Sequence, residues 1–319
     1  MQKQATSPSE RATSDLVVGV DGGGTHTRAR LANLRGEMLG NGEAGPSNPN
    51  AIGYAAAQAE LLAAIEGAFQ DARMERQNLA AACFGIGGVH RTEERERLGA
   101  WARETIAPSV LVVNDGEIVL TAGTPENWGV ALIAGTGSFA WGKARDGRTA
   151  RAGGWGYLIG DEGSGFDLAR EALRAAAQSA DGRRAPTRLL DAFLQYWDLG
   201  QPMELIPRIY RTGMKPGDIA ALAPLVMRVA KEGDSTAQAL LKRAAALLAD
   251  TVMAVARALS FGVDAVPVAL SGGLLLEADL LRAELTHDLT TRSDRFSPFT
   301  VVNEPVNGAV KAAIALVRG

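Results

Sequence analysis

The sequence begins the same structural pattern twice. Residues 17–31 read VVGVDGGGTHTRARL, an apolar strand that runs into an aspartate, three glycines and a threonine before alternation resumes. Residues 128–153 repeat the theme as strand, glycine-rich turn, strand, turn and strand. In a chain of 319 residues, such a repeat predicts two related domains rather than one.

The order of expected elements indicates the fold class. Alternating apolar and polar residues predict a meander of strands at 16–21, 26–34 and 37–43. A helix at 51–73, a strand at 79–86, a helix at 91–106 and a strand at 110–115 should follow. Beyond the second meander we expect a mostly helical 164–262, a strand at 266–273, a helix at 274–289, a strand near 299–303 and a last helix. This alternation is typical of an α/β fold with parallel strands.

The two glycine-rich turns share a chemistry. In DGGGT (21–25) and AGTGS (134–138), backbone N–H groups without bulky neighbours can converge on phosphate oxygens, with hydroxyls as added donors. A tight hairpin that needs positive φ would explain either turn alone. Their shared place, at the first turn of two similar meanders, favours phosphate binding.

Two other phosphate motifs fail on their context. Residues 137–144, GSFAWGKA, match a P-loop but put Ala144 where a Ser or Thr must bind magnesium. Residues 135–140, GTGSFA, fit a dinucleotide fingerprint but lead into a strand, so no helix N-terminus is there for a pyrophosphate.

Composition excludes several classes of function. A formal charge of −3 and an isoelectric point near 5.8 offer no broad basic surface, so nucleic acid is not an expected partner. The single cysteine, Cys83, rules out internal disulfides and a thiolate zinc site, and we expect it to be a buried structural thiol. His26, His90 and His287 lack ligand spacing.

The termini and hydropathy indicate where the protein acts. Residues 1–15 are polar, lack the apolar core of a signal peptide and are expected to form a disordered tail. No apolar run reaches the ~18 residues of a membrane span. We therefore expect a cytoplasmic protein without a membrane partner.

Several motifs together resemble the actin and sugar-kinase ATPase superfamily. They are DGGGT, ND at a strand end, AGTGS, SGG before a helix and GAVKAA in the last helix. Within it, GGWGYLIGDEGSGFDLAREAL (153–173) is similar to the N-acetylglucosamine kinase and glucosamine kinase family. The resemblance implies two actin-like, ribonuclease H-like domains, 16–118 with 304–319 and 119–303, and an interdomain cleft for ATP and sugar.

The resemblance also implies an activity and its cofactors. ATP with Mg²⁺ would phosphorylate the 6-hydroxyl of an amino sugar, N-acetyl-D-glucosamine or D-glucosamine. Phosphates would be bound by Gly22, Gly23, Gly24, Thr25, Gly135, Thr136, Gly137 and Ser138. Adenosine would lie at Ser271, Gly272 and Gly273, and Asp21 would help to hold Mg²⁺, through water.

Asp115 is the expected catalytic base. In VLVVNDGEIVL it is predicted to stand at the C-terminal end of a strand, where open α/β sheets present ligand-binding groups. The local alternative is an N-cap of a helix that begins near Gly116.

The expected sugar-binding residues come from several loops. They are Asn48, Gly87, Gly88, Asp115, Gly154, Trp155, Asp161 and Glu162. Each motif has a structural alternative: GPSNPN is rich in turn formers, and DEGSG could simply cap a helix that starts near Ser164.

The sequence departs from the family pattern at two positions, and two alternative functions are open. Many relatives have lysine where this chain has His26, and some have a polar residue in place of Phe139, so the identity of the amino sugar stays open.

An ATPase activator of a 2-hydroxyacyl-CoA dehydratase would need two cysteines per subunit for its iron-sulfur cluster. A non-catalytic sugar sensor would usually carry a helix-turn-helix, for which the tail has no room. A homodimer is expected because such families commonly form one.

Overall fold

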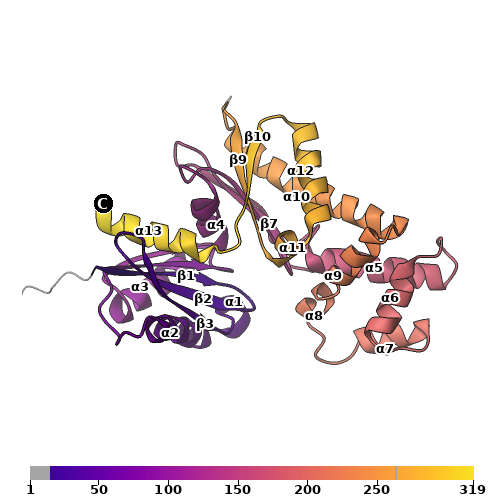
Figure 1. Cartoon of the computed structure of the whole chain (residues 1–319), viewed down its shortest axis with the longest axis horizontal. Coiled ribbons are helices and arrows are strands. Elements are labelled where there is room, and N and C mark those ends of the chain that lie inside the picture. The colour runs from indigo at the N-terminus through magenta and orange to yellow at the C-terminus, as the bar shows by residue number, and fades with distance from the viewer. Residues whose placement is uncertain (1–14, 263) are drawn as a thin grey trace, which may run out of the picture. The chain divides into compact units, whose positions relative to one another are not determined.

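The computed structural model describes residues 15–262 and 264–319, and Figure 1 labels its helices and strands. The chain divides into two compact units. The first runs to Ile118 and includes Val306–Gly319, and the second comprises Val119–Pro305. The tail expected over residues 1–15 lies outside the described residues, except for the exposed Asp15.

The first unit is built on a five-stranded sheet in the order β3-β2-β1-β4-β5. Its strands are β1 (Leu16–Gly22), β2 (Thr27–Asn33), β3 (Met38–Ala44), β4 (Ala81–Ile86) and β5 (Ser109–Val113). The first three form an antiparallel meander, and β4 and β5 extend the sheet parallel to β1. The expected opening meander is therefore confirmed.

Both faces of this sheet are covered. The helices of the unit are α1 (Pro49–Ile52), α2 (Tyr54–Asp71), α3 (Thr92–Thr105) and α13 (Val306–Arg318), with α4 (Asp115–Gly123) leading into the second unit. Val18 and Val20 pack with residues of α2 and α3, whereas Val17 packs with residues of α13. Side chains that alternate between two buried faces explain why β1 is almost wholly apolar.

The second unit repeats this topology. Its strands are β6 (Gly129–Ala134), β7 (Ser138–Lys143), β8 (Thr149–Gly153), β9 (Val266–Ser271) and β10 (Phe296–Val301). In the order β8-β7-β6-β9-β10, an antiparallel meander again precedes two parallel strands. The predicted duplication and the α/β class of both domains are thereby confirmed.

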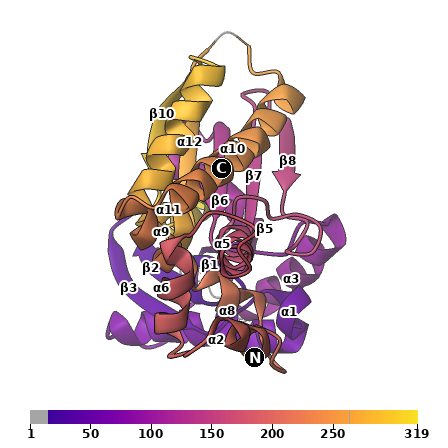
Figure 2. The same ribbon diagram turned by 90° about the vertical axis from the view of Figure 1, so that its right-hand side faces the viewer.

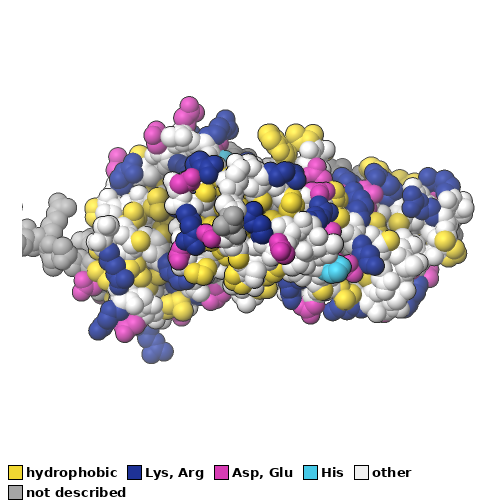
Figure 3. Space-filling model, turned by 90° about the horizontal axis from the view of Figure 1, so that it is seen from above, with side chains coloured by type: hydrophobic (Ala, Val, Ile, Leu, Met, Phe, Trp, Pro, Cys, Tyr) yellow, Lys and Arg dark blue, Asp and Glu magenta, His cyan; other side chains and the backbone are white. Residues whose placement is uncertain are grey.

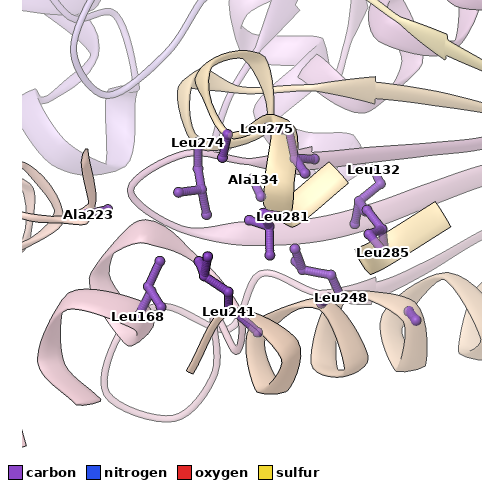
Figure 4. Packing of buried hydrophobic residues seen from close by; sticks show 14 of the residues in the cluster. Leu132, Ala134, Leu168, Ala223, Leu241, Leu248, Leu274, Leu275, Leu281 and Leu285 are labelled. Carbon is purple, nitrogen blue, oxygen red and sulfur yellow. The ribbon is translucent and has the colours of Figure 1, made fainter. Parts of the chain in front are cut away.

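Helices between and around these strands build the larger core. They are α5 (Gly165–Ala180), α6 (Arg188–Tyr196), η1 (Pro202–Glu204), α7 (Leu205–Ile209), α8 (Pro216–Ala220), α9 (Ala223–Lys231), α10 (Ser235–Leu259), α11 (Gly273–Glu277) and α12 (Asp279–Arg292). The long helices α10 and α12 pack side by side, as Figure 2 shows. Leu132 of β6, Leu248 of α10 and Leu285 of α12 meet in the apolar cluster of Figure 4.

Several elements differ from the sequence-based expectation. The helix expected at 274–289 is divided at Ala278 into α11 and α12. The helix expected at 51–73 is divided at Gly53, whose φ of 83° lies in the left-handed region and closes α1 before α2 begins. The last strand begins at Phe296 rather than near residue 299.

The surface of the protein carries charged side chains of both signs (Figure 3). Basic and acidic side chains are interspersed on the face drawn in Figure 3. Within residues 15–262 and 264–319, no helix is long and apolar enough to cross a membrane.

Candidate active site

The first glycine-rich loop closes the hairpin between β1 and β2. The amide of Gly23 donates to the carbonyl of His26 at 3.0 Å. None of Gly22, Gly23 and Gly24 has a positive φ, so the alternative that the turn needs left-handed glycines is wrong. A Cβ atom at Gly24 would meet no atom within 4 Å, and one at Gly23 would lie 3.8 Å from its nearest neighbour. Neither the conformation nor the packing of the protein requires glycine at these two positions.

The orientation of this loop leaves amides available to a ligand. The carbonyl of Gly23 accepts the amides of Ser47 and Asn48, at 3.0 and 3.2 Å. Because the carbonyl and the next amide of a trans peptide point in opposite directions, the N–H of Gly24 points away from these partners. Gly24 and Thr25 are exposed, and neither amide makes a hydrogen bond within the described part of the chain.

Asp21 and Asp115 form a pair of carboxylates beside this loop. Burial and the charge of Asp115 raise the pKa of Asp21 to about 7, and the guanidinium of Arg28 opposes them. A divalent cation would relieve this repulsion, and Mg²⁺ is typically held by one or two carboxylates together with substrate phosphates. The described residues contain no cluster of three or more metal-binding side chains.

Asp115 lies at a helix start rather than at a strand end. Strand β5 ends at Val113, and Asp115 is the first residue of α4. The side chain of Asn114 accepts the amide of Glu117 at 2.9 Å and caps the helix, so the interpretation of Asp115 as the N-cap is wrong. The carboxylate of Asp115 instead faces Gly87, where a Cβ atom would lie 3.4 Å from Asp115 Oδ2.

The sugar-binding residues expected in the first unit lie together. Gly87 donates its amide to the carbonyl of Gly22 at 2.7 Å. Gly88 has a φ of 83°, and a Cβ there would lie 2.4 Å from Asn48 Oδ1. The side chain of Asn48 also caps α1 by accepting the amide of Asn50. Asn48, Gly87, Gly88 and Asp115 therefore adjoin the first glycine-rich loop.

The second glycine-rich loop closes the hairpin between β6 and β7. Gly135 and Gly137 also lack a positive φ, so the turn alternative is wrong here too. A Cβ at Gly135 would come only within ordinary contact distance, 3.7 Å, of the amide nitrogen of Gly273. The amides of Gly165 and Phe166, at the start of α5, donate to the carbonyls of Gly135 and Thr136. By the same trans-peptide geometry, the amides of Thr136 and Gly137 point away from α5.

Asp161 and Glu162 contact this second loop. Asp161 Oδ1 accepts the amide of Ser138 at 3.4 Å, and a Cβ at Gly137 would lie 2.7 Å from Asp161 Oδ2. Burial raises the pKa of Asp161 although amides of Ser138 and Gly156 stabilise its charge. The hydroxyl of Ser138 is buried and donates to the backbone carbonyl of Glu162 at 2.7 Å, so it already has a protein acceptor.

Neither acidic side chain caps α5. Ser164 accepts the amide of Asp167 at 3.2 Å and is the N-cap. The capping alternative for DEGSG thus accounts for Ser164 but not for Asp161 or Glu162. Gly154 joins the same group, because its amide donates to the carbonyl of Ser138 at 2.9 Å. Trp155 is 73% exposed and presents its ring to solvent.

The segment expected to bind adenosine also adjoins the second loop. Gly272 has a φ of 93°, and a Cβ there would lie 2.4 Å from the carbonyl of Ala134. Gly273 is the first residue of α11, and a Cβ atom there would meet no atom within 4 Å. The hydroxyl of Ser271 is buried and donates to the carbonyl of Val302, so this side chain fixes the backbone of its own unit.

Cys83 is buried within β4, as predicted for a structural thiol. Burial and the charge of Glu117 raise the pKa of its thiol. Sequence reasoning overlooked the buried Thr27 and Ser47 beside the first loop, and it noted Asn114 within the ND motif but not as a helix cap. The buried Thr27 and Ser47 carry no local signal, whereas Asn114 stands three residues before Glu117 and could have been recognised as a cap.

Two α/β units of the same topology, each opening with a glycine-rich hairpin loop, define an actin-like ATPase. The chain belongs to the BadF/BadG/BcrA/BcrD ATPase family, whose model matches residues 18–314. The resemblance inferred from the sequence motifs is therefore confirmed.

Similar proteins include several amino-sugar kinases. The chain is 33% identical to the N-acetylmuramic acid/N-acetylglucosamine kinase of Clostridium acetobutylicum, over 92% of this chain and 96% of that protein. It is 26% identical to the N-acetyl-D-glucosamine kinase of Dictyostelium discoideum, over 95% and 98%. The structure of a candidate N-acetylglucosamine kinase from Chromobacterium violaceum aligns with a TM-score of 0.77 and 31% identity, covering 96% of this chain and all of that one.

Proposed function

We propose that this protein is an ATP-dependent kinase that phosphorylates the 6-hydroxyl of an amino sugar, N-acetyl-D-glucosamine or D-glucosamine. The names and near-complete coverage of its relatives support this reaction. The single structural observation that carries it is that both hairpin loops turn backbone amides away from their protein partners, Gly24 in the first loop and Thr136 and Gly137 in the second. Amides turned outward in a loop without bulky side chains are suited to bind phosphate oxygens.

Each group of residues has a role in this reaction. The loops 22–25 and 135–138 would bind phosphates through backbone amides, and 271–273 would contact adenosine. Asp115 would accept the proton of the sugar hydroxyl as it attacks the γ-phosphorus, while Asn48, Gly87, Gly88, Gly154, Trp155, Asp161 and Glu162 would hold the sugar. Such transfers have a loose transition state, so positioning and charge neutralisation account for most of the rate.

Asp21 would hold Mg²⁺ beside the first loop, with Asp115 close by. The ion would neutralise the charge that develops on the phosphate oxygens. The proximity of the two carboxylates supports this assignment, since burial and the charge of Asp115 both raise the pKa of Asp21.

A panel assay of ATP consumption tests the proposed reaction. N-acetylglucosamine, glucosamine, N-acetylmuramic acid, glucose and no sugar would be compared at saturating ATP and Mg²⁺. An amino sugar is expected to accelerate ATP consumption and to yield one sugar phosphate per ADP. Equal consumption with and without every sugar would contradict the proposal and favour an ATPase of another kind.

We infer a cytoplasmic homodimer as the working state of the enzyme. ATP is supplied inside the cell, and sugar kinases of this kind commonly pair. Light scattering after size exclusion should give twice the chain mass of 33.4 kDa. A value near one chain mass at micromolar concentration would contradict the dimer.

A further inference from the structure

We propose that Ser47, together with Thr27, is a positioning residue that sets Asn48 and the amide of Gly24 at a fixed separation. This inference rests on the proposed function. It assigns a role to two residues that bind neither substrate themselves.

Both residues are polar and wholly buried. Ser47 lies in the connection from β3 to α1, and Thr27 begins β2, and each has 0% of its surface exposed. A buried hydroxyl destabilises a protein unless it is hydrogen bonded. The two hydroxyl oxygens are 2.8 Å apart, and Thr27 Oγ1 also lies 2.6 Å from the carbonyl oxygen of Gly45.

The donors in this chain of hydroxyls can be assigned by elimination. A hydroxyl has one proton, and a carbonyl oxygen can only accept. Thr27 therefore donates to Gly45, and Ser47 donates to Thr27. The bond from Ser47 to Thr27 fixes the side chain of Ser47. The bond from Thr27 to Gly45 holds residues 45–47 against the start of β2.

Ser47 also lies directly on the first glycine-rich loop. A Cβ atom at Gly22 would be 2.2 Å from Ser47 Oγ, so the hydroxyl occupies the space above that backbone. The amides of Ser47 and Asn48 hold the carbonyl of Gly23. That carbonyl sets the direction of the Gly24 amide, because the two belong to the same trans peptide.

Residues 47 and 48 therefore position one predicted contact to the sugar and one predicted contact to the phosphate. Asn48, the predicted sugar ligand, follows Ser47 directly, and Gly24 N–H is a predicted phosphate donor. A small error in the relative placement of reacting groups can lower a rate about 100-fold. Loss of the Ser47 hydroxyl should thus affect turnover more than the binding of either substrate.

Ser47→Ala and Thr27→Val test this role, since each removes a hydroxyl with little change of volume. Either variant should lower kcat for sugar phosphorylation about 10-fold or more, with KM values for sugar and ATP changed less than about 3-fold. The double variant should be no worse than Thr27→Val alone, because that variant already removes the hydrogen bond between Ser47 and Thr27. Thr27→Ser keeps the hydroxyl and should restore kcat.

Thr187→Val is the matched control. Thr187 is a buried threonine of the second unit whose hydroxyl bonds Asp234, and neither residue is among the candidate site residues. Its loss should lower the melting temperature without lowering kcat.

A second readout is the ratio of ATP hydrolysed by water to sugar phosphate formed. A purely structural role of Ser47 and Thr27 would not change this ratio. In Ser47→Ala or Thr27→Val, a larger share of ATP should be hydrolysed by water for each sugar phosphate formed. Normal kcat and normal partition in either folded variant would overturn the inference. If Ser47→Ala does not fold, Thr27→Val decides, and a wild-type enzyme without sugar phosphorylation would instead refute the proposed function.

Discussion

The carboxylate of Asp115 lies close enough to Asp21 that its charge adds to the effect of burial in raising the pKa of Asp21. The two residues come from the end of β1 and the start of α4, which are far apart in sequence and adjacent in space. One is the proposed ligand of Mg²⁺ and the other the proposed base. Their interaction is the basis of the two predictions on pH dependence below.

Asp115→Asn should lower kcat about 10²- to 10⁴-fold, the usual contribution of a general base. The amide cannot accept the proton of the sugar hydroxyl. Because Asn114 rather than Asp115 caps α4, the helix should persist and the melting temperature should change little. Steady-state kinetics with a nucleotide-binding control checks this, and near-normal kcat in a folded variant would show that another residue is the base.

Mg²⁺ binding should depend on pH through the ionisation of Asp21. With a pKa of about 7, Asp21 is protonated below neutrality and competes poorly for the cation there. The Mg²⁺ concentration that half-saturates binding of a non-hydrolysable ATP analogue should therefore fall as pH rises from 6 to 8. In Asp115→Asn the midpoint should move to lower pH, because the repelling charge is gone. ATP titrates equally in both experiments, so an identical pH profile for the two proteins would contradict the coupling.

Asp21→Asn should stabilise the metal-free protein at high pH. The pKa of Asp21 rises from 3.8, the ordinary value for an aspartate, to about 7 in the folded protein, so the folded state binds the proton more tightly. The free energy of unfolding then falls as pH rises from about 4 to about 7. At pH 8 without Mg²⁺ the variant should melt a few degrees above the wild type, and near pH 3 the difference should vanish. A variant that melts lower at pH 8 would argue against the raised pKa.

Asp167→Ala should lower the free energy of unfolding by about 2–4 kcal/mol. Its side chain is 4% exposed, accepts the amide of Gly163 and pairs with Arg170 and Arg243. The arginines are about half exposed and can regain water, so the loss is below that of a fully buried pair. Urea denaturation measures it.

Asp181→Ala is the control for this measurement, since the Asp181–Arg183 pair is exposed. It should change the free energy of unfolding by about 0.5 kcal/mol or less. Equal losses in the two variants would mean that the Asp167 network contributes no more than a surface pair.

Local patterns predicted most of the fold. Alternation along β1 and β2, together with two glycine-rich turns, was sufficient for the duplicated meanders, because strand pairing across a short turn is a local matter. The prediction for Asp115 was less accurate. The apolar run VLVV gives no sign that the strand ends before Asn114, and the cap at Asn114 depends on a hydrogen bond from the amide of Glu117.

Contacts between distant segments could not be predicted in the same way. Ser47 lies over Gly22, and Asp161 lies against Gly137, but nothing near either residue in the sequence indicates its partner. The φ angles of Gly24 and Gly135 likewise had to come from the structure. They exclude a turn that needs left-handed glycine at these two positions.

The affinity for a non-hydrolysable ATP analogue with Mg²⁺ tests the central claim most directly, in Gly24→Ala and Gly135→Ala. Both positions accept a Cβ atom in the protein alone, so the variants should fold normally, as should the control Gly200→Ala, where a Cβ also meets nothing within 4 Å. The account predicts about 10-fold weaker binding or more for each loop variant and unchanged binding for the control. Wild-type affinity in both loop variants would contradict the assignment of these loops to phosphate.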